Sequence, residues 1–246
     1  MTPENLSIII PLGPDEDQLA PLLDDLRRLG SRAEIIVVTC DEGAARCKAD
    51  DLNIQWLQSA QGRAIQQNTG ARAAGGDFLW FVHADSRPTA QGLAALMAAL
   101  MAAPDALHYF HLKFAADGPP LMRLNEWGAW ARSQILKVPF GDQGFCLKKD
   151  HFNQIGGFPE QVPYGEDHLL VWRARQAGIK LRCTGAPLMT SARAYGAHGW
   201  AALTAVYQLR WIKQALPEFY RLIRRQQGNR AVLVPEKKIK GGRHNE

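Results

Sequence analysis

Three short polar clusters, rich in acidic side chains, follow apolar runs of the sequence and are the first candidates for chemistry. They are Asp15-Glu16, Asp41-Glu42 and His83-Ala84-Asp85. If the apolar runs are parallel strands, the clusters gather at the carboxyl edge of one sheet, where ligands bind in open α/β folds. Carboxylates held together repel one another unless a cation or a hydrogen-bonding ligand lies among them. A diphosphate bound through Mg²⁺ or Mn²⁺ meets that need, because these ions prefer carboxylate oxygens and complete their shell with water and phosphate.

The apolar runs predict the strands of that sheet. Four of them lack regular polar alternation: 7–11 (SIIIP), 34–39 (EIIVVT), 54–57 (IQWL) and 78–82 (FLWFV). Such runs are typical of strands buried on both faces. Helices are predicted at residues 15–29, 64–74 and 90–103. The alternation of strands and helices indicates an α/β fold, with a largely parallel sheet covered by helices on both faces.

The pattern changes after Pro104. Residues 107–114 (LHYFHLKF) alternate and predict a half-exposed strand, and a loop with a helix is expected over 115–138. Further strands are predicted at 144–148 and 179–183, and further helices at 150–155 and 167–176. From Trp200 the chain is expected to be helical to Arg225, with an interruption at Pro217. Residues 228–246 are polar and basic and are expected to be disordered.

Composition and charge disfavour several classes of protein. Hydrophobic residues make up 46% and charged residues 22% of the 246 residues, which is ordinary for a globular protein with a sizeable core. The four cysteines include no CxxC pair, which disfavours structural zinc and favours reduced thiols in the cytoplasm. No basic segment precedes the first apolar run, so a secretory signal is not predicted. The stretch 93–103 is shorter than the ~20 residues that span a bilayer, so no transmembrane helix is expected.

Five segments, read in order, resemble the motifs of family-2 glycosyltransferases. They are SIIIP, GRAIQQNTGARAAGGDFLWFVHAD, GDQGFCLKK, GGFP and the pair Glu166-Asp167 at the start of a predicted helix. The resemblance covers residues 7–195 and is closest to a small bacterial branch, which Ser191-Ala192-Arg193 also resembles. It implies a GT-A fold, mostly parallel, with a Rossmann-like nucleotide-binding half.

The same resemblance implies the domain organisation. Residues 1–227 would form one domain. Its parts are a nucleotide-sugar-binding half at 1–105, an acceptor or catalytic half at 106–195 and a helical segment at 196–227, followed by the basic tail 228–246.

The resemblance also implies roles for single residues. Asp85 stands where the family's DxD motif places a metal-binding carboxylate, and His83 replaces the first aspartate of that motif as a weaker ligand of Mg²⁺ or Mn²⁺. Asp167, with Glu166 beside it, stands where inverting members keep the base that deprotonates the acceptor hydroxyl. A positioned base of this kind raises a rate by ~10²–10⁴-fold.

Four further positions are implied to contact substrates. Arg63 and Asn68 lie where the family contacts the nucleotide-diphosphate sugar. Asp142 and Gln143 lie on the segment that lines the acceptor side.

Two departures from the family leave alternatives open. LGPDE follows the first strand in place of Asn-Glu, and Thr39 stands where an aspartate would hold the nucleotide base, so base recognition is weakened or moves to Asp41. These losses are also expected of a nucleotide-sugar-binding homologue without catalysis. A sugar-phosphate nucleotidyltransferase is the other alternative, although its triphosphate site would need a glycine-rich, basic loop where LGPDE is acidic.

The C-terminal helical segment has two interpretations. Aromatic and leucine side chains recur there at helical spacing among basic residues: Trp200, Leu203, Tyr207 and Trp211. Such a stripe packs on its own domain or lies on an anionic membrane, where a lipid-linked acceptor would be reached. The expected location is therefore the cytoplasm or the inner face of the membrane. Nucleic acid is not an expected partner, because no recognition module accompanies the basic tail.

Structural interpretations compete with each functional one. Asp85 suits a turn after a strand, and the Glu166-Asp167 pair suits a helix N-terminus, where the dipole favours each acid by ~0.3–1 kcal/mol. Trp127 and Trp130 are expected to pack within the protein, with stacking on an acceptor as the alternative. The functional interpretation requires that Asp85 and Asp167, far apart in the chain, face a common cleft.

Overall fold

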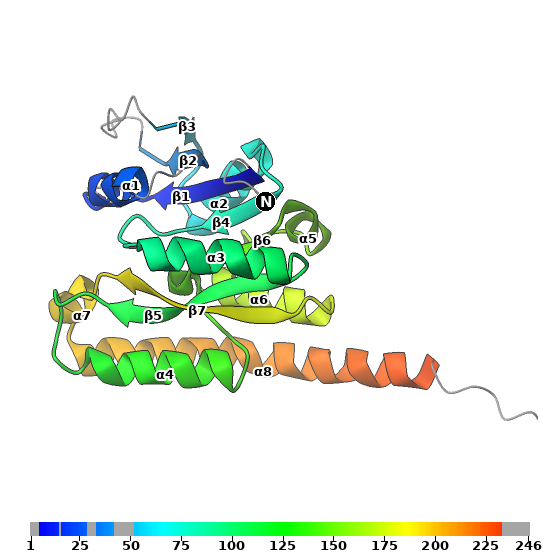
Figure 1. Cartoon of the computed structure of the whole chain (residues 1–246). Coiled ribbons are helices and arrows are strands. Elements are labelled where there is room, and N and C mark those ends of the chain that lie inside the picture. Colours follow the sequence, from blue (N-terminus) through cyan, green and yellow to red (C-terminus); the bar gives the residue numbers. More distant parts are fainter. Residues whose placement is uncertain (1–4, 15, 29–32, 42–51, 233–246) are drawn as a thin grey trace, which may run out of the picture.

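A seven-stranded, mostly parallel sheet forms the centre of the protein (Figure 1). The computed structural model describes residues 5–14, 16–28, 33–41 and 52–232. The strands are β1 (Leu6–Leu12), β2 (Glu34–Thr39), β3 (Ile54–Gln58), β4 (Phe78–Phe81), β5 (Leu107–Phe114), β6 (Phe145–Lys148) and β7 (Leu181–Thr190). Their order in the sheet is β3-β2-β1-β4-β6-β5-β7. Neighbours are parallel except for β6, which runs antiparallel to β4 and β5, so the predicted architecture is confirmed.

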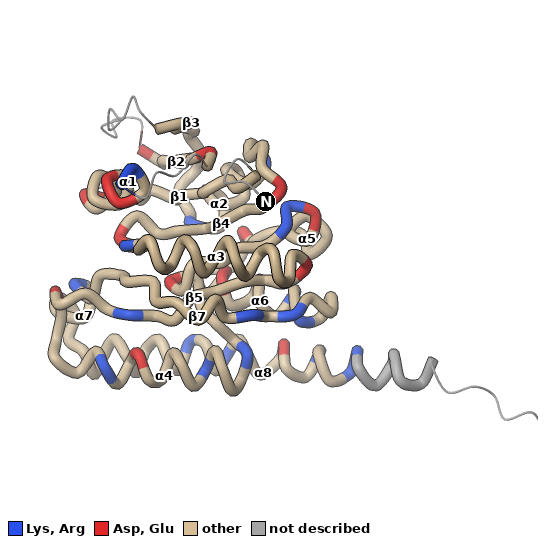
Figure 2. Tube along the Cα trace, in the orientation of Figure 1, with Lys and Arg blue, Asp and Glu red and all other residues tan. Residues whose placement is uncertain are grey.

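Helices cover both faces of the sheet. They are α1 (Leu19–Arg28), α2 (Arg63–Ala73), α3 (Ala90–Ala102), α4 (Met122–Gln134), α5 (Lys149–Gln154), α6 (Glu166–Gln176), α7 (Arg193–His198) and α8 (Trp200–Val232). Ile8 and Ile10 of β1 belong to the core under α1 and α3, whereas Ile9 belongs to the core under α2 and α6. Because both faces are buried, the central strands β1 and β4 carry no charged residue (Figure 2).

Close contact between α2 and the sheet depends on a small residue. A Cβ added to Gly70 would lie 2.6 Å from Cγ2 of Ile9 and 3.2 Å from Cγ2 of Val38. Glycine therefore lets this helix pack directly on β1 and β2, and it fixes the position of Arg63 at the start of the helix.

The second half of the sheet differs from the sequence prediction. The strand predicted over 107–114 is present, but its first four residues are buried rather than half exposed. It lies between β6 and β7, and the Tyr109 hydroxyl donates to the Ser133 carbonyl of α4, which covers it. The last strand extends to Thr190 instead of ending at residue 183, because it pairs with β5 past an irregularity between Tyr109 and His111.

The helix α8 is longer than predicted. The expected interruption at Pro217 is wrong, since one helix runs from Trp200 to Val232. Proline removes one backbone hydrogen bond, but Pro217 is exposed, so the carbonyl that loses its partner can be hydrated. The helix passes the predicted boundary at residue 227, and residues 233–246 of the predicted tail lie outside the described residues. Within the part of the chain that is described, no helix combines the length and the apolar character needed to cross a bilayer.

Candidate active site

A cavity of about 830 Å³ contains both residues on which the functional interpretation depends. Asp85, which follows β4, and Asp167, in the first turn of α6, both line it. Its walls also come from the start of α2, from α4 and from α8. The required common cleft is therefore present.

Backbone donors fix the carboxylate of Asp167. Its Oδ2 accepts the N–H of Gly141 at 2.6 Å, and its Oδ1 accepts the N–H of His168 at 2.8 Å. A Cβ on Gly141 would lie 3.0 Å from Cβ of Asp167, so a small residue suits this approach. Gly165, with φ of 72°, turns the chain into α6 in a left-handed conformation that favours glycine. The carboxylate thus has a defined orientation and keeps lone pairs free for a ligand.

Glu166 and Arg63 form a second charged element of the cavity. Nη1 of Arg63 lies 3.8 Å from Oε1 of the buried Glu166. Burial raises the pKa of Glu166, the nearby Asp167 raises it further, and Arg63 opposes the rise. Arg63 is half exposed, so its guanidinium can serve both Glu166 and a bound anion.

Asp85 and His83 lie where the sequence predicts them, after β4. Burial raises the pKa of Asp85, and a hydrogen bond from the Thr190 side chain partly offsets this rise. Burial also lowers the pKa of His83 to about 3, with repulsion from Arg63 adding to the shift. His83 is therefore neutral at physiological pH, and its Nε2 is buried without a hydrogen-bond partner in the described structure.

Asp142 lies close enough to Arg132 of α4 to feel its charge, and Arg132 is a residue that the sequence did not single out as functional. Burial raises the pKa of Asp142 to about 6, while the positive charge of Arg132 opposes the rise. Arg132 is itself buried; its Nε donates to the Val138 carbonyl at 3.1 Å, and its Cζ lies 3.4 Å from the centroid of the Phe140 ring. The available signal was its spacing, since Arg132 follows Ala129 on the buried face of α4, where an arginine needs a reason to be present.

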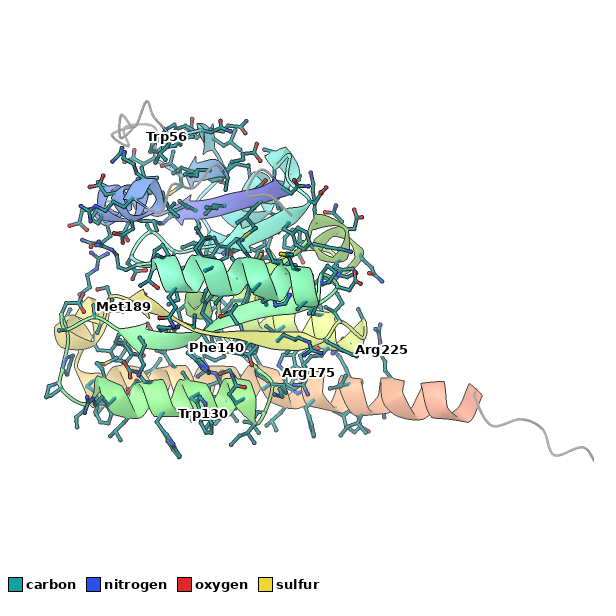
Figure 3. All side chains as sticks on the ribbon, in the orientation of Figure 1. Trp56, Trp130, Phe140, Arg175, Met189 and Arg225 are labelled. Atoms are coloured by element: carbon teal, nitrogen blue, oxygen red, sulfur yellow. The ribbon has the colours of Figure 1, made fainter. Side chains whose placement is uncertain are left out.

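The helix α8 contributes a second residue missed by sequence reasoning, Gln214. Its Oε1 lies 2.7 Å from Nε2 of His168, and its Nε2 donates to the Tyr164 carbonyl at 2.7 Å. These contacts hold Tyr164, which precedes Gly165, and His168, which directly follows the acidic pair. Figure 3 shows the labelled Phe140 between the sheet and the layer of α4 and α8, where its ring lies 5.7 Å from that of His168.

Three of the predicted site residues do not line this cavity. Asn68 uses its amide to donate to the Phe158 carbonyl and Glu160, and to accept the N–H of Phe158, so it holds the GGFP segment. It faces a separate cavity of about 540 Å³. Gln143 is fully buried and donates to the Phe110 carbonyl, which positions the turn that carries Asp142. Asp41 lies exposed after β2.

Two carboxylates of the cavity suit a divalent ion that also binds substrate phosphate. Among the described residues, no set of three or more His, Cys, Asp or Glu side chains is arranged to hold an ion by itself. Mg²⁺ does not need such a set, because it is commonly held by one or two carboxylates, with substrate phosphates and water completing its shell. The Asp85 carboxylate and the unpartnered Oδ1 of Asp142 suit that mode of binding.

Comparison with known sequences shows the family of the chain. A family model described as Glycosyl transferase family 2 matches residues 7–158. Pre-mycofactocin glycosyltransferases of two Mycobacterium tuberculosis strains, CDC 1551 / Oshkosh and H37Rv, are 25% identical over 222 residues, which is 82% of this chain and 46% of theirs. The chain thus spans about half the length of these curated relatives.

Solved structures share the fold. The mannosyltransferase PcManGT from Pyrobaculum calidifontis, in complex with GDP-Man and Mn²⁺, aligns with a TM-score of 0.66 at 18% identity, over 92% of this chain and 70% of that one. S. aureus TarS 1-349 in complex with UDP-GlcNAc aligns with a TM-score of 0.56 at 19% identity, over 78% and 58%. These likenesses confirm the predicted GT-A fold.

Proposed function

The chain belongs to glycosyl transferase family 2, and we propose that it transfers a sugar from a nucleotide-diphosphate donor to an acceptor hydroxyl with inversion. One observation carries the proposal: Asp85 and Asp167 line the same cavity, and two backbone N–H groups orient the Asp167 carboxylate. The GDP-Man and UDP-GlcNAc bound to structurally similar proteins support a donor of this class.

Asp167 acts as the base. The acceptor oxygen attacks the anomeric carbon from the face opposite the leaving group, and its proton passes to a free lone pair of the Asp167 carboxylate. The bond between the anomeric carbon and the diphosphate oxygen breaks as the new bond forms, and the nucleoside diphosphate leaves with its electron pair. Because Gly141 and His168 hold both oxygens of Asp167, little reorganisation is needed when the proton moves.

Positive charge in the cavity stabilises the leaving group. Arg63 and Arg132 line the same cavity and supply fixed charge near the acids. A divalent ion held by Asp85, with His83 and Asp142 near it, would neutralise the diphosphate. The neutral imidazole of His83 is suited to coordinate or to accept a hydrogen bond there, because burial keeps it unprotonated.

Nucleotide diphosphate release tests this function. The protein is incubated with a panel of nucleotide sugars and Mn²⁺ or Mg²⁺, and release is compared between wild type and Asp167→Asn. We expect metal-dependent release that falls by ~10²–10⁴-fold in the variant. Asp150→Asn is the matched control, since Asp150 is an exposed acid in the first turn of α5.

The same assay distinguishes the two alternatives. Pyrophosphate formed from a nucleoside triphosphate would indicate a nucleotidyltransferase. Tight donor binding without release, in the presence of a broad acceptor panel, would indicate a binding homologue. We also propose a lipid-linked acceptor and a membrane contact through the C-terminal helices. The exposed apolar side chains of α4 and α8 support this contact.

A further inference from the structure

Exposed apolar side chains are concentrated in two segments of the protein. Of the fifteen large hydrophobic residues that are exposed among the described residues, thirteen lie within 121–136 or 206–220, and the other two are Met101 and Met189. The first segment contains α4 and the second belongs to α8. Trp127 and Trp130, which the sequence predicts to pack within the protein, are 68% and 46% exposed, so that prediction is wrong.

The two helices lie together as the outermost layer of the molecule (Figure 1). Asn125 of α4 donates to the Thr204 hydroxyl and accepts the Trp200 indole N–H from α8, at 3.1 and 2.7 Å. Figure 3 shows Trp130 projecting from α4 on the side away from the sheet. The two sets of exposed side chains therefore belong to one surface, which we call the α4–α8 face.

Two stripes with opposite environments run along α8. Trp211, Ala215 and Leu222 pack against Val138 and Trp172, so they form the inner stripe. Leu209, Ile212, Leu216 and Tyr220 recur at intervals of three and four residues on the outer side and are 70%, 42%, 64% and 55% exposed. From Trp200 to Arg225 only Ala215 and Leu222 are buried, so the domain covers little of this helix.

Charge on the helix indicates what covers its outer stripe. Residues 200–225 contain five basic side chains, all exposed (Arg210, Lys213, Arg221, Arg224 and Arg225), and one acid, Glu218, which pairs with Arg221 (Figure 2). A second copy of the chain would bring the same positive charge and be repelled. An anionic lipid surface complements it, and aromatic and aliphatic side chains flanked by Arg and Lys are typical of helices that lie in a membrane interface.

We propose that the α4–α8 face docks the protein on an anionic membrane surface, with α8 lying in the plane of the interface. The same helices line the cavity through Asn125 and Arg132 of α4 and through Tyr207 and Gln214 of α8. Docking therefore brings the cavity next to the lipid headgroups. Membrane docking rests on the proposed function in one respect, since it would place the acceptor side of the cavity at the lipid surface. Its test needs no donor and no turnover, so docking and sugar transfer can each fail without the other.

Flotation of the full chain with vesicles tests the proposal. We expect binding to vesicles that contain phosphatidylglycerol, and little binding to phosphatidylcholine alone. About 1 M salt, at which the Debye length is about 3 Å, should release most of the protein. Lys213→Gln with Arg224→Gln should weaken binding by about 25-fold, because each basic residue near such a surface contributes about fivefold.

A double substitution on the outer stripe separates apolar insertion from charge alone. Leu209→Glu with Leu216→Glu should weaken binding by at least about tenfold, because two apolar side chains are lost and two acids face the lipid. Met101→Glu is the matched control and should bind as wild type, because Met101 is equally exposed but lies on α3.

Three results would overturn the proposal. One is the absence of binding to anionic vesicles at low salt. Another is binding that survives the double substitution but is lost on removal of residues 233–246, which would assign attachment to the basic tail. The third is a dimer in solution that the double substitution dissociates, which would make a second copy the occupant of the α4–α8 face.

Discussion

Replacing Gln214 by methionine is expected to destabilise the start of α6 and to slow transfer. His168 is 2% exposed, so its Nε2 cannot turn to water when Oε1 of Gln214 is removed, and a buried polar group left unpaired costs about 1–3 kcal/mol. The Tyr164 carbonyl loses its donor as well but is less buried. Methionine keeps a similar volume, so the expected loss is about 2–3 kcal/mol, or a fall in Tm of roughly 5–10 °C.

Thermal denaturation and nucleotide diphosphate release measure the two effects. Because Gln214 holds the residues on both sides of the turn that presents Asp167, we expect kcat to fall by about 10-fold or more, as a displaced carboxylate loses its geometry. Gln214→Glu keeps an acceptor for His168 and should recover part of the stability. Ala201→Met is the control, since Ala201 is an exposed residue of the same helix to which no contact of the site is assigned. Wild-type Tm and kcat in Gln214→Met would show that Gln214 positions neither His168 nor Asp167.

Three further substitutions follow from the structure. Burial raises the pKa of Asp142 from its usual 3.8 to about 6, so the folded state binds this proton more tightly than the unfolded state does. Stability should therefore fall as the pH rises from about 4 to about 6. Denaturation measured across this pH range should show that Asp142→Asn lacks the part of the fall that Asp142 causes. Gly144 has φ of 61°, and a Cβ there would lie 2.7 Å from Cδ2 of Leu188, so urea denaturation should show Gly144→Ala destabilised by about 1–3 kcal/mol. Arg132→Lys keeps the charge but loses the stacking on Phe140, and release at saturating donor should slow by about 10²-fold if Arg132 stabilises the leaving group.

The central strands were predictable because burial on both faces leaves a strong local signal. The run EIIVVT has the same limits as β2. LHYFHLKF has the same limits as β5, but its alternation predicted a half-exposed strand where the first four residues are buried. The extension of β7 to Thr190 was not predictable, because GAPLMT has no strand pattern of its own and pairs with β5 through tertiary contact. The continuity of α8 past Pro217 was also missed, because exposure of that turn lets water hydrate the freed carbonyl and so lowers the cost of proline within the helix.

The site was predictable where topology alone decides it. A carboxylate after β4 must lie at the carboxyl edge of the sheet, and the motif at Glu166-Asp167 brings the second acid to the same edge. Arg132 and Gln214 were not identified, because only the packing of α4 and α8 over the cavity shows what they touch. Asn68 lies in the right motif, but its hydrogen bonds to Phe158 turn it toward the other cavity.

The position of a bound donor shows whether Asp85 and Asp167 act on the same substrate. A crystal structure of the protein with Mn²⁺ and a slowly reacting nucleotide-sugar analogue would locate the diphosphate and the sugar. We expect the diphosphate beside Asp85, with the anomeric carbon between it and Asp167. A diphosphate bound in the separate cavity beside Arg72 and Arg173, with Asp85 and Asp167 contacting no part of the donor, would contradict it.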